Sequence, residues 1–450
     1  ALAALTLLAK RSTRKPRGKG VELLKQSGRD VVHSKLFVPK WSSLRRAPAA
    51  TTSSYLHLGA TQTDIDLSRG DIISIYEQDV RKAPPISLKP HVSHRTQVDD
   101  GTSTRHVVRV LQWNINGLLG TRSLAWLDPN KKCIDARIIA SALLSTHADV
   151  LLLQETANEV SEWHTQHGCA EAPKEMALLD QLLHSAGFSI YRTPLTLRSR
   201  QDNPALIATR VPLLDGGSFP LDGDYGSVML EVDGETRSGR YVEMPLGSTG
   251  EVPTLGFVVA QLHHRNHHVR NSPATGVRAT EVDHVLKACC NNNRPEHLRH
   301  MRRLGTIFAT DFAEVRQSEY SAKEWAFLSQ RTLRGADGVH GAEGLLEQAG
   351  FSNVSDVHGV ERGGLQQANG APRFTAWDGC TVDHTYVQSE KGAHGNDLVK
   401  VAAVNTLPVL LSDHLPTVVD LEVDLSPSSL ARVDREACTR LEQLLTTQAS

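Results

Sequence analysis

The chain lacks an excess of charge of either sign: 49 Lys and Arg residues balance 50 Asp and Glu residues, and the formal net charge is −1. Proteins that coat nucleic acid without sequence preference usually present a strong positive field. The balance weighs against that class but leaves room for a nuclease with a local basic groove. At 450 residues, the chain could form two or three domains of roughly 150 residues, or one large domain.

Cysteine and long apolar runs are also scarce. The six cysteines include no Cys-x-x-Cys pair, which favours reduced thiols inside the cell. They are Cys133, Cys169, Cys289, Cys290, Cys380 and Cys438. No apolar run approaches the roughly 18 residues of a transmembrane helix, and no internal repeat is found. We therefore expect an intracellular monomer with reduced cysteines and no membrane span.

The first 50 residues differ in composition from the rest. They hold twelve Lys and Arg residues and two acids, a local charge of 12 − 2 = +10. Arg-rich, acid-poor segments are typical of mitochondrial or plastid transit peptides, while a basic tail that binds nucleic acid and a disordered extension are the alternatives. We predict this extension at 1–50, a linker or lead-in at 51–104, one α/β domain at 105–425 and a helical tail at 426–450.

Polar residues that could carry chemistry follow several apolar, strand-like segments. An α/β scaffold commonly builds its site from such strand ends. The segments are Val107–Leu118 with Asn114 and Asn116, Asp149–Thr156 with Glu155, Thr306–Ala313 with Asp311, Thr381–Val387 with Asp383, and Leu407–Val423 with Asp413 and His414. The last begins with the apolar run Leu407–Leu411, which predicts a strand that ends at the Asp-His pair.

Each of these residues also has an ordinary interpretation. Asn114 and Asn116 before a glycine are typical turn residues. Asp311 is a suitable helix N-cap, and Pro416 would end a turn at Asp413-His414. Singly, these interpretations are the simpler ones. Five such strand ends in one chain are better explained by a shared site.

The motifs WNINGL, LLQET, TDFA, TVDHTYV and LSDHLP resemble, in this order, those of the endonuclease/exonuclease/phosphatase superfamily. The resemblance spans roughly residues 105–425. It implies a DNase-I-like four-layer α/β sandwich, with two mixed β-sheets flanked by helices. It also implies a metal-dependent phosphoric ester hydrolase, a phosphodiesterase or nuclease.

The resemblance implies a metal site first. It places Asn116, Glu155 and Asp413 at a Mg²⁺ or Mn²⁺ ion, which as a hard cation prefers oxygen ligands and neutralises charge on a phosphate. Asn114 is implied to bind the phosphate group of the substrate. Many members carry Asp where this chain has Asn116, which lowers the negative charge of the site.

The resemblance also implies four catalytic residues. Asp311 would orient and deprotonate the attacking water, and His414 would contact the scissile phosphate. Asp383 would pair with His263 or His414 and fix its tautomer. His263 ends an apolar strand at Leu255–His264, where many members have Thr-His-Leu, and would also contact phosphate.

The histidines around His263 leave alternatives open. His264, His267 and His268 follow closely, so a zinc site is conceivable by composition. No cysteine or carboxylate with ligand spacing completes such a site. A polar loop after a buried strand is the plainest interpretation.

One motif departs from the family pattern. Where members have Gly-Asp-X-Asn, this chain has Thr310-Asp311-Phe312-Ala313. Alanine neither donates nor accepts a hydrogen bond, and losing one preorganised polar contact commonly costs on the order of 100-fold in rate. Two functions therefore remain: a hydrolase with a rearranged site, or a phosphate-binding module that has lost catalysis.

The substrate is predicted from the motifs. WNINGL and LQET are most similar to the exonuclease III and tyrosyl-DNA phosphodiesterase branches, which favours nucleic acid. His263 is more similar to the deadenylase, DNase and phosphatase branches. The same fold serves inositol phosphates and sphingomyelin, so a phosphatase or lipid phosphodiesterase is the alternative.

Helical periodicity and stop signals predict the outer layers. Helices are expected at 134–144, at 176–185 ending before Gly187, at 281–303 with an interruption at 289–293, and at 343–349 ending before Gly350. The Gly- and Asp-rich residues 215–250 predict hairpins and loops.

Overall fold

The computed structural model describes residues 55–57, 85–86, 95–97, 104–118, 133–156, 169, 171–193, 205–210, 227–232, 235–246, 253–262, 277–289, 294, 296–299, 301–312, 316–320, 322, 342–357, 375–376, 381–407, 409 and 411–430. The predictions for residues 1–50, for His263 and its neighbouring histidines, and for Ala313 lie outside these ranges. Three short strands precede the main fold: β1 (Tyr55–His57), β2 (Pro85–Ile86) and β3 (Arg95–Gln97).

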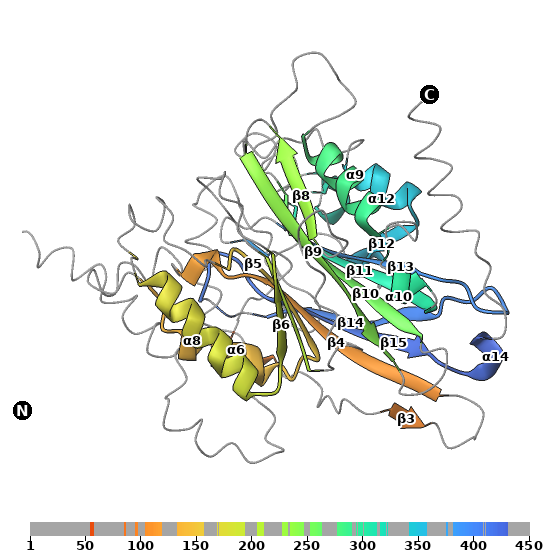
Figure 1. The fold of residues 1–450 in the computed structure, drawn as a ribbon, viewed down its shortest axis with the longest axis horizontal. Helices are drawn as coiled ribbons and strands as arrows, with labels where there is room; N and C mark the ends of the chain where they lie inside the picture. The colour runs from red at the N-terminus through yellow and green to blue at the C-terminus, as the bar shows by residue number, and fades with distance from the viewer. Residues whose placement is uncertain are drawn as a thin grey trace, which may run out of the picture.

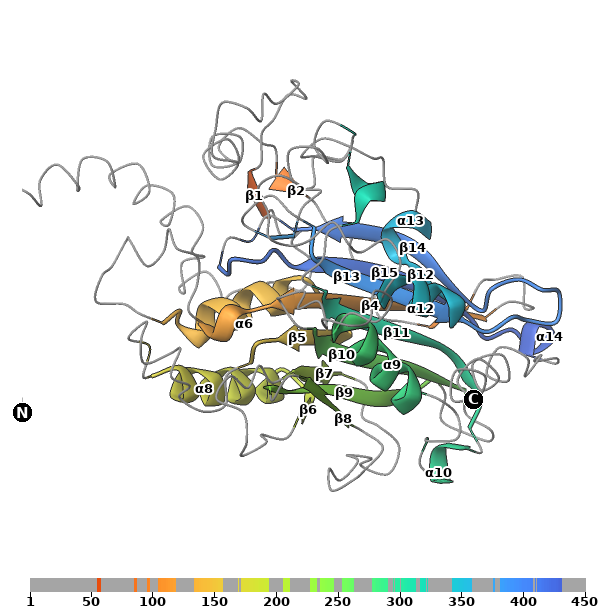
Figure 2. The same ribbon diagram turned by 90° about the horizontal axis from the view of Figure 1, so that it is seen from above.

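Two mixed β-sheets make up the centre of the molecule (Figures 1 and 2). One has the order β14-β15-β4-β5-β7-β6, with β3 paired to β4, and the other has the order β12-β13-β11-β10-β9-β8. In each sheet one pair is parallel, β4 with β5 and β10 with β11, and the other pairs are antiparallel. The strands of the first sheet are β4 (Thr104–Asn114), β5 (Val150–Gln154), β6 (Ser189–Arg192), β7 (Leu206–Thr209), β14 (Val399–Thr406) and β15 (Thr417–Asp424). Those of the second are β8 (Ser227–Val232), β9 (Glu235–Pro245), β10 (Thr254–Gln261), β11 (Arg303–Asp311), β12 (Phe351–Asn353) and β13 (Asp383–Ser389).

Two pairs of helices cover the outer faces, and Figure 1 shows them on opposite sides of the molecule. α6 (Ala136–Ser145) and α8 (Ala172–Ser185) pack on the first sheet, and α9 (Val277–Cys289) and α12 (Ala342–Gln348) on the second. The shorter helices are η1 (Asn116–Leu118), α10 (Glu296–Arg299), η4 (Gln317–Glu319), α13 (Val354–Val357) and α14 (Pro427–Leu430). Helix, sheet, sheet and helix give the four layers that the resemblance implied.

The alternation of side chains along each strand creates these layers. In β4, Val108 and Val110 lie in the core between the two sheets, whereas Leu111 and Trp113 lie in the core beneath α6 and α8. Strand β10 does the same from the other side, because Val259 faces the first sheet while its neighbours pack under α9 and α12. Apolar residues on both faces explain why these strands have nearly continuous hydrophobic sequences.

The helices expected at 134–144, 176–185 and 343–349 are confirmed, whereas the one expected at 281–303 is α9 (Val277–Cys289) followed only by the short α10, and Arg303 already begins β11. α6 is capped by Asp135, whose side chain accepts a hydrogen bond from the Arg137 N–H at 2.9 Å. Gly187 after α8 and Gly350 after α12 have φ of 88° and 82°, a backbone conformation that favours glycine at helix ends. The hairpin expected within 215–250 is β8 with β9.

The strand predicted at Leu407–Leu411 is wrong. The preceding strand is β14, which ends at Thr406, and the described residues that follow it belong to a compact turn. Pro408 supplies no backbone N–H for a sheet, and the Leu407 N–H donates back to the Pro416 carbonyl at 2.8 Å. Leu407, Val409 and Leu411 are buried under the helix layer instead.

The expectation of fully reduced cysteines is also wrong, because Cys133 and Cys169 form a disulfide with their Cα atoms 5.3 Å apart. The bond joins two residues that each lie three positions before a helix, Cys133 before α6 and Cys169 before α8, and Cys169 is buried. These positions are 36 residues apart and have none of the short spacings that signal a cysteine motif. Their proximity depends on how the two helices pack, which the sequence pattern did not show.

Removal of this disulfide is expected to lower the free energy of unfolding by roughly 3 kcal/mol, because a cross-link across 36 residues restricts the unfolded chain. Urea denaturation with and without dithiothreitol measures the effect. The Cys133→Ala/Cys169→Ala double variant is the control, since its midpoint should not respond to reductant. A wild-type midpoint equally indifferent to reductant would contradict the prediction.

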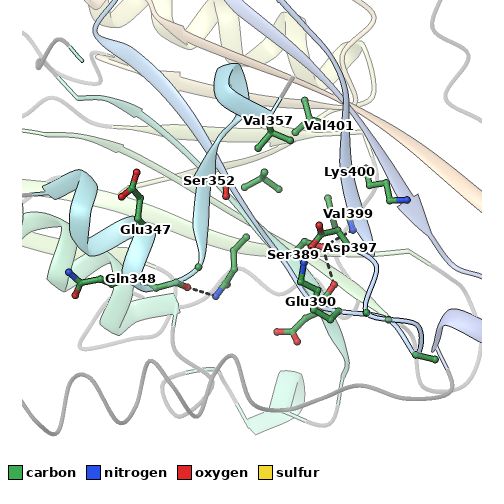
Figure 3. A pocket seen from close by; sticks show the side chains of 18 residues that line it. Glu347, Gln348, Ser352, Val357, Ser389, Glu390, Asp397, Val399, Lys400 and Val401 are labelled. Carbon is green, nitrogen blue, oxygen red and sulfur yellow. Dashed lines mark hydrogen bonds and ion pairs between the residues drawn. The ribbon is translucent and has the colours of Figure 1, made fainter. Parts of the chain in front are cut away.

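A hollow of about 970 Å³ opens between the edges of the two sheets, beside β12 and β14 (Figure 3). Val357, Val387, Val399 and Val401 contribute its apolar wall. It lies at the end of β13 opposite Asp383, so the candidate site is elsewhere. Within the described part of the chain, no helix has the length and apolar character needed to cross a membrane.

Candidate active site

Inward-facing side chains change from apolar to polar at one edge of the sandwich. In β4 the row that begins with Val108 and Val110 continues with Gln112 and Asn114. The strands of the second sheet follow the same rule. On each strand the last inward-facing residue at this edge is polar: Gln261 follows Val259 in β10, Asp311 follows Ala309 in β11, and Asp383 lies two positions before Thr385 in β13. Strand alternation therefore gathers the polar groups above the apolar core between the sheets.

The strand register fixes the neighbours within each sheet. Gln261 pairs with Asp311 across β10 and β11, and Asp311 pairs with Asp383 across β11 and β13. One step below, Gln112 joins the two sheets: its side-chain amide donates to the Thr310 carbonyl at 2.8 Å, and its oxygen accepts from the Thr385 hydroxyl at 2.6 Å. The two halves of the site are thus held at a fixed height relative to each other.

Asp383 and His414 form a buried hydrogen-bonded pair, with 2.7 Å between Asp383 Oδ2 and His414 Nδ1. The sequence left His263 and His414 as partners for Asp383, and the structure pairs it with His414. The Thr375 hydroxyl accepts from the Asp383 N–H at 2.9 Å, and the Trp113 indole donates to the His414 carbonyl at 2.9 Å. The orientation of His414 is therefore fixed by one hydrogen bond to its ring and by another to its backbone carbonyl.

The second ring nitrogen of His414 faces carboxylates. Nε2 lies 4.0 Å from Asp311 Oδ2 and 4.0 Å from Asp413 Oδ1. Burial by itself lowers the pKa of His414, but the negative charges of Asp383 and Asp311 and the hydrogen bond that the ring donates to Asp383 raise that pKa well above its usual value. The imidazole is therefore positively charged at neutral pH in the metal-free protein.

Glu155 sits just past the end of β5 in a left-handed backbone conformation, with φ of 53°. A non-glycine residue there is strained and persists where surrounding contacts hold it. Those contacts come from the loop after β4: Ile115 N–H donates to the Gln154 carbonyl at 3.1 Å and Gly117 N–H to the Glu155 carbonyl at 2.9 Å. The two loops therefore place the Glu155 side chain at the site.

Burial, and then the negative charge of Asp413, raise the pKa of Glu155 from 4.5 to about 6. The hydrogen bond from Asn114 acts in the opposite direction but does not cancel them. A carboxylate under this repulsion is stabilised by any cation that approaches it.

Asn114 and Gln261 bridge the same two carboxylates. Asn114 Nδ2 donates to Glu155 Oε1 at 2.9 Å and to Asp311 Oδ2 at 3.0 Å. Gln261 Nε2 donates to Glu155 Oε1 and, at 3.3 Å, to Asp311 Oδ2. Gln261 was not among the site residues predicted from the motifs. Its place two positions after the inward-facing Val259 was the signal that could have identified it.

The remaining predicted residues lie at the margin. Asn116 lies in η1 with φ of 48°, and its backbone N–H donates to Asn114 Oδ1 at 2.9 Å. The side chain of Asp413 is 45% exposed and accepts from the Ser412 hydroxyl at 3.3 Å. His263 lies outside the described residues, so its predicted role stays a prediction.

No family model and no curated protein matches the chain. A comparison of folds does find solved structures that are similar to this chain. An endonuclease/exonuclease/phosphatase from Beutenbergia cavernae is 15% identical, with a TM-score of 0.41 over 70% of this chain and 72% of that one. The human nocturnin catalytic domain with bound sulfate is 14% identical, with a TM-score of 0.39 over 70% of this chain and 94% of that one. A family protein from Bacteroides thetaiotaomicron is 12% identical, with a TM-score of 0.41 over 71% of this chain and 99% of that one.

Two features of this chain decide the fold. The structure has two mixed sheets face to face with helices outside, and Asn114, Glu155, Asp311, Asp383 and His414 from the motifs come together at one edge of that sandwich. The fold is a four-layer α/β sandwich, as the resemblance implied.

The resemblance implied a divalent cation, and the donor set of the site fits one. Glu155, Asp311, Asp383 and Asp413 offer oxygen atoms. Burial, and then the negative charges of Asp413 and Asp311, raise the pKa of Glu155, and a cation would relieve both effects. Ligand atoms of Asp311, Asp383 and His414 lie within 4.8 Å of one another. Since His414 Nδ1 and Asp383 Oδ2 are hydrogen bonded to each other, that pair is less available to a cation than Glu155 is.

Proposed function

We propose that this chain is a Mg²⁺- or Mn²⁺-dependent phosphodiesterase that hydrolyses a phosphate ester in nucleic acid. The observation that carries the proposal is the buried Asp383–His414 pair, which faces Asp311 across 4.0 Å with Glu155 beside it. General base, cationic donor and metal ligand are the three groups that hydrolysis of an anionic ester requires.

Asp311 is the group that takes the proton from the attacking water. Its Oδ2 already accepts from Asn114 and Gln261, so the carboxylate cannot rotate freely. The two amide donors hold this carboxylate in one orientation, and a carboxylate oriented toward the water can take up its proton. A water that Asp311 orients would attack in line with the leaving oxygen.

His414 stabilises the negative charge that develops on the phosphate. Asp383 occupies Nδ1, which leaves Nε2–H free to donate to a phosphate oxygen. The raised pKa of His414 keeps the ring charged at neutral pH, and a charged donor in a dry site stabilises an oxyanion far more than it would in water. His263 would add a second donor from the end of β10.

Glu155, with Asn116 and Asp413, would hold the divalent cation. When bound, the cation neutralises charge on the phosphate and on the leaving oxygen. Asn114 anchors Glu155, and its predicted contact with the phosphate would replace one of the two hydrogen bonds that its amide donates. Nucleic acid is the proposed substrate because WNINGL and LQET are most similar to branches that act on nucleic-acid ends.

The test is hydrolysis of a fluorescent single-stranded oligonucleotide, of bis-p-nitrophenyl phosphate and of p-nitrophenyl phosphate, each with Mg²⁺ or EDTA. We expect Mg²⁺-dependent cleavage of the two diesters, because Glu155 needs the cation to act on the phosphate. Glu155→Ala should abolish it. Asp397→Asn is the control, since Asp397 pairs with Lys391 at the far end of the sandwich.

Cleavage of the monoester p-nitrophenyl phosphate alone would show that the protein is a phosphatase and not a phosphodiesterase. Binding of the oligonucleotide without turnover in Mg²⁺ would favour the phosphate-binding module, and activity gained in Ala313→Asn would trace the loss to that position. Turnover that survives EDTA would contradict a metal-dependent mechanism.

A further inference from the structure

We propose that Gln261 is a positioning residue for the reaction: its side-chain amide holds the general base Asp311 against the metal ligand Glu155. The inference rests on the proposed function and deepens it. It assigns a role to a residue that none of the sequence motifs contained, at a site where the motif amide of position 313 is replaced by alanine.

The contacts of Gln261 are specific to the two carboxylates. One nitrogen, Nε2, donates to Glu155 Oε1 and to Asp311 Oδ2, and an NH₂ group has two hydrogens to divide between them. The side chain is only 5% exposed, so water cannot easily replace these bonds. The register places Gln261 directly beside Asp311 on the neighbouring parallel strand.

Asn114 makes the matching pair of contacts from the opposite sheet. Its Nδ2 donates to the same two oxygen atoms, Glu155 Oε1 and Asp311 Oδ2. Two amides, one from β4 and one from β10, therefore clamp two carboxylates that lie 156 positions apart (311 − 155) in the sequence. Like charges repel, so the carboxylates would separate without donors between them.

The other atom of the Gln261 amide is unused. Oε1 is buried and has no hydrogen-bond partner among the described residues. It lies about 2.3 Å from Nε2 by covalent geometry, which places it beside Asp311 and Glu155. A buried acceptor without a partner costs free energy, and the reaction offers two partners for it, a proton of the attacking water and the cation.

Side-chain length decides which replacements can serve. Asparagine at position 261 is one methylene shorter, so its amide cannot reach both oxygens. Glutamate keeps the length but exchanges the donor for a third carboxylate. Methionine matches the volume of glutamine and removes both donor and acceptor, so it tests the clamp with the least disturbance of packing.

The experiment compares wild type, Gln261→Met, Gln261→Asn and Gln261→Met/Ala313→Asn as full-length chains. Turnover of bis-p-nitrophenyl phosphate in Mg²⁺ gives kcat and KM, Mn²⁺ binding is followed by electron paramagnetic resonance, and thermal unfolding is recorded in EDTA. Gln388→Met is the matched control, because Gln388 is equally buried on β13 but donates to the Ala349 carbonyl away from the site.

We expect kcat to fall by about 100-fold in Gln261→Met and Gln261→Asn, as for other lost preorganised donors, and Mn²⁺ to bind at least tenfold more weakly. The unfolding temperature should change no more than in Gln388→Met. Asparagine at position 313 should recover part of the lost kcat, because it returns an amide to the motif that contains Asp311.

An equal loss of stability and activity in Gln261→Met and Gln388→Met would overturn the proposal, as would unchanged kcat and Mn²⁺ binding in Gln261→Met. Failure of the proposed function gives a different result. The wild type would then show no turnover with any diester, while weaker Mn²⁺ binding in Gln261→Met would still support the clamp.

Discussion

Asp311→Asn is expected to lower kcat for bis-p-nitrophenyl phosphate by about a thousand-fold, the range of a lost general base. The change is small in shape and removes the charge that accepts the proton. Asparagine keeps one oxygen that can accept from Asn114 and Gln261, so the fold should be retained. KM should change little, because Asp311 acts on the water rather than on the substrate.

Circular dichroism and thermal unfolding of the same samples separate a chemical defect from a structural one. Asp397→Asn supplies the comparison for loss of a carboxylate elsewhere. Activity of Asp311→Asn within tenfold of the wild type would show that another group takes the proton.

Glu155→Gln is expected to abolish Mg²⁺-dependent turnover and, at the same time, to stabilise the metal-free protein at pH 7 by up to about 2 kcal/mol. Folding raises the pKa of Glu155 from 4.5 to about 6, and a shift of that size corresponds to this free energy. The protonated form is favoured in the folded state. Glu155 therefore contributes its full stabilisation of the wild-type fold below pH 4.5, and this stabilisation is lost as the pH rises through 6.

Glutamine at position 155 has no charge, so the free-energy cost of burying an ionised carboxylate at pH 7 is absent in the variant. Urea denaturation in EDTA at pH 7 and at pH 4.5 measures the difference between wild type and Glu155→Gln, which should be largest at pH 7 and small at pH 4.5. Saturating Mg²⁺ should then stabilise the wild type and leave the variant unchanged. A Glu155→Gln protein that is less stable than wild type in EDTA at pH 7 would contradict the raised pKa.

The sequence predicted the strands and the order of the motifs because both depend on local pattern. Inward and outward positions of β4 and β10 follow from a period of two, and Asn114, Glu155 and Asp311 stand where those patterns end. The pairing of Asp383 with His414 could not be decided, since it depends on which loop comes closest to β13. Motif comparison passed over Gln261, although the alternation in β10 pointed inward at that position.

The errors have a physical cause as well. The apolar residues of 407–411 satisfy the composition of a strand, yet Leu407, Val409 and Leu411 fill the core beneath the helices from a turn. The pairing of Cys133 with Cys169 depends on the packing of α6 against α8, which no spacing in the sequence records. Local pattern thus predicted the elements, while contacts between distant elements had to come from the structure.

The division of the site between two sheets has a consequence for how this protein loses activity. Asn114 and Glu155 come from one sheet, Gln261, Asp311 and Asp383 from the other, and Gln112 spans the space below them. Neither half of the chain holds a complete set of groups. A partly folded intermediate with only one sheet assembled would therefore lack part of the proposed site, and activity would require both sheets to be in place.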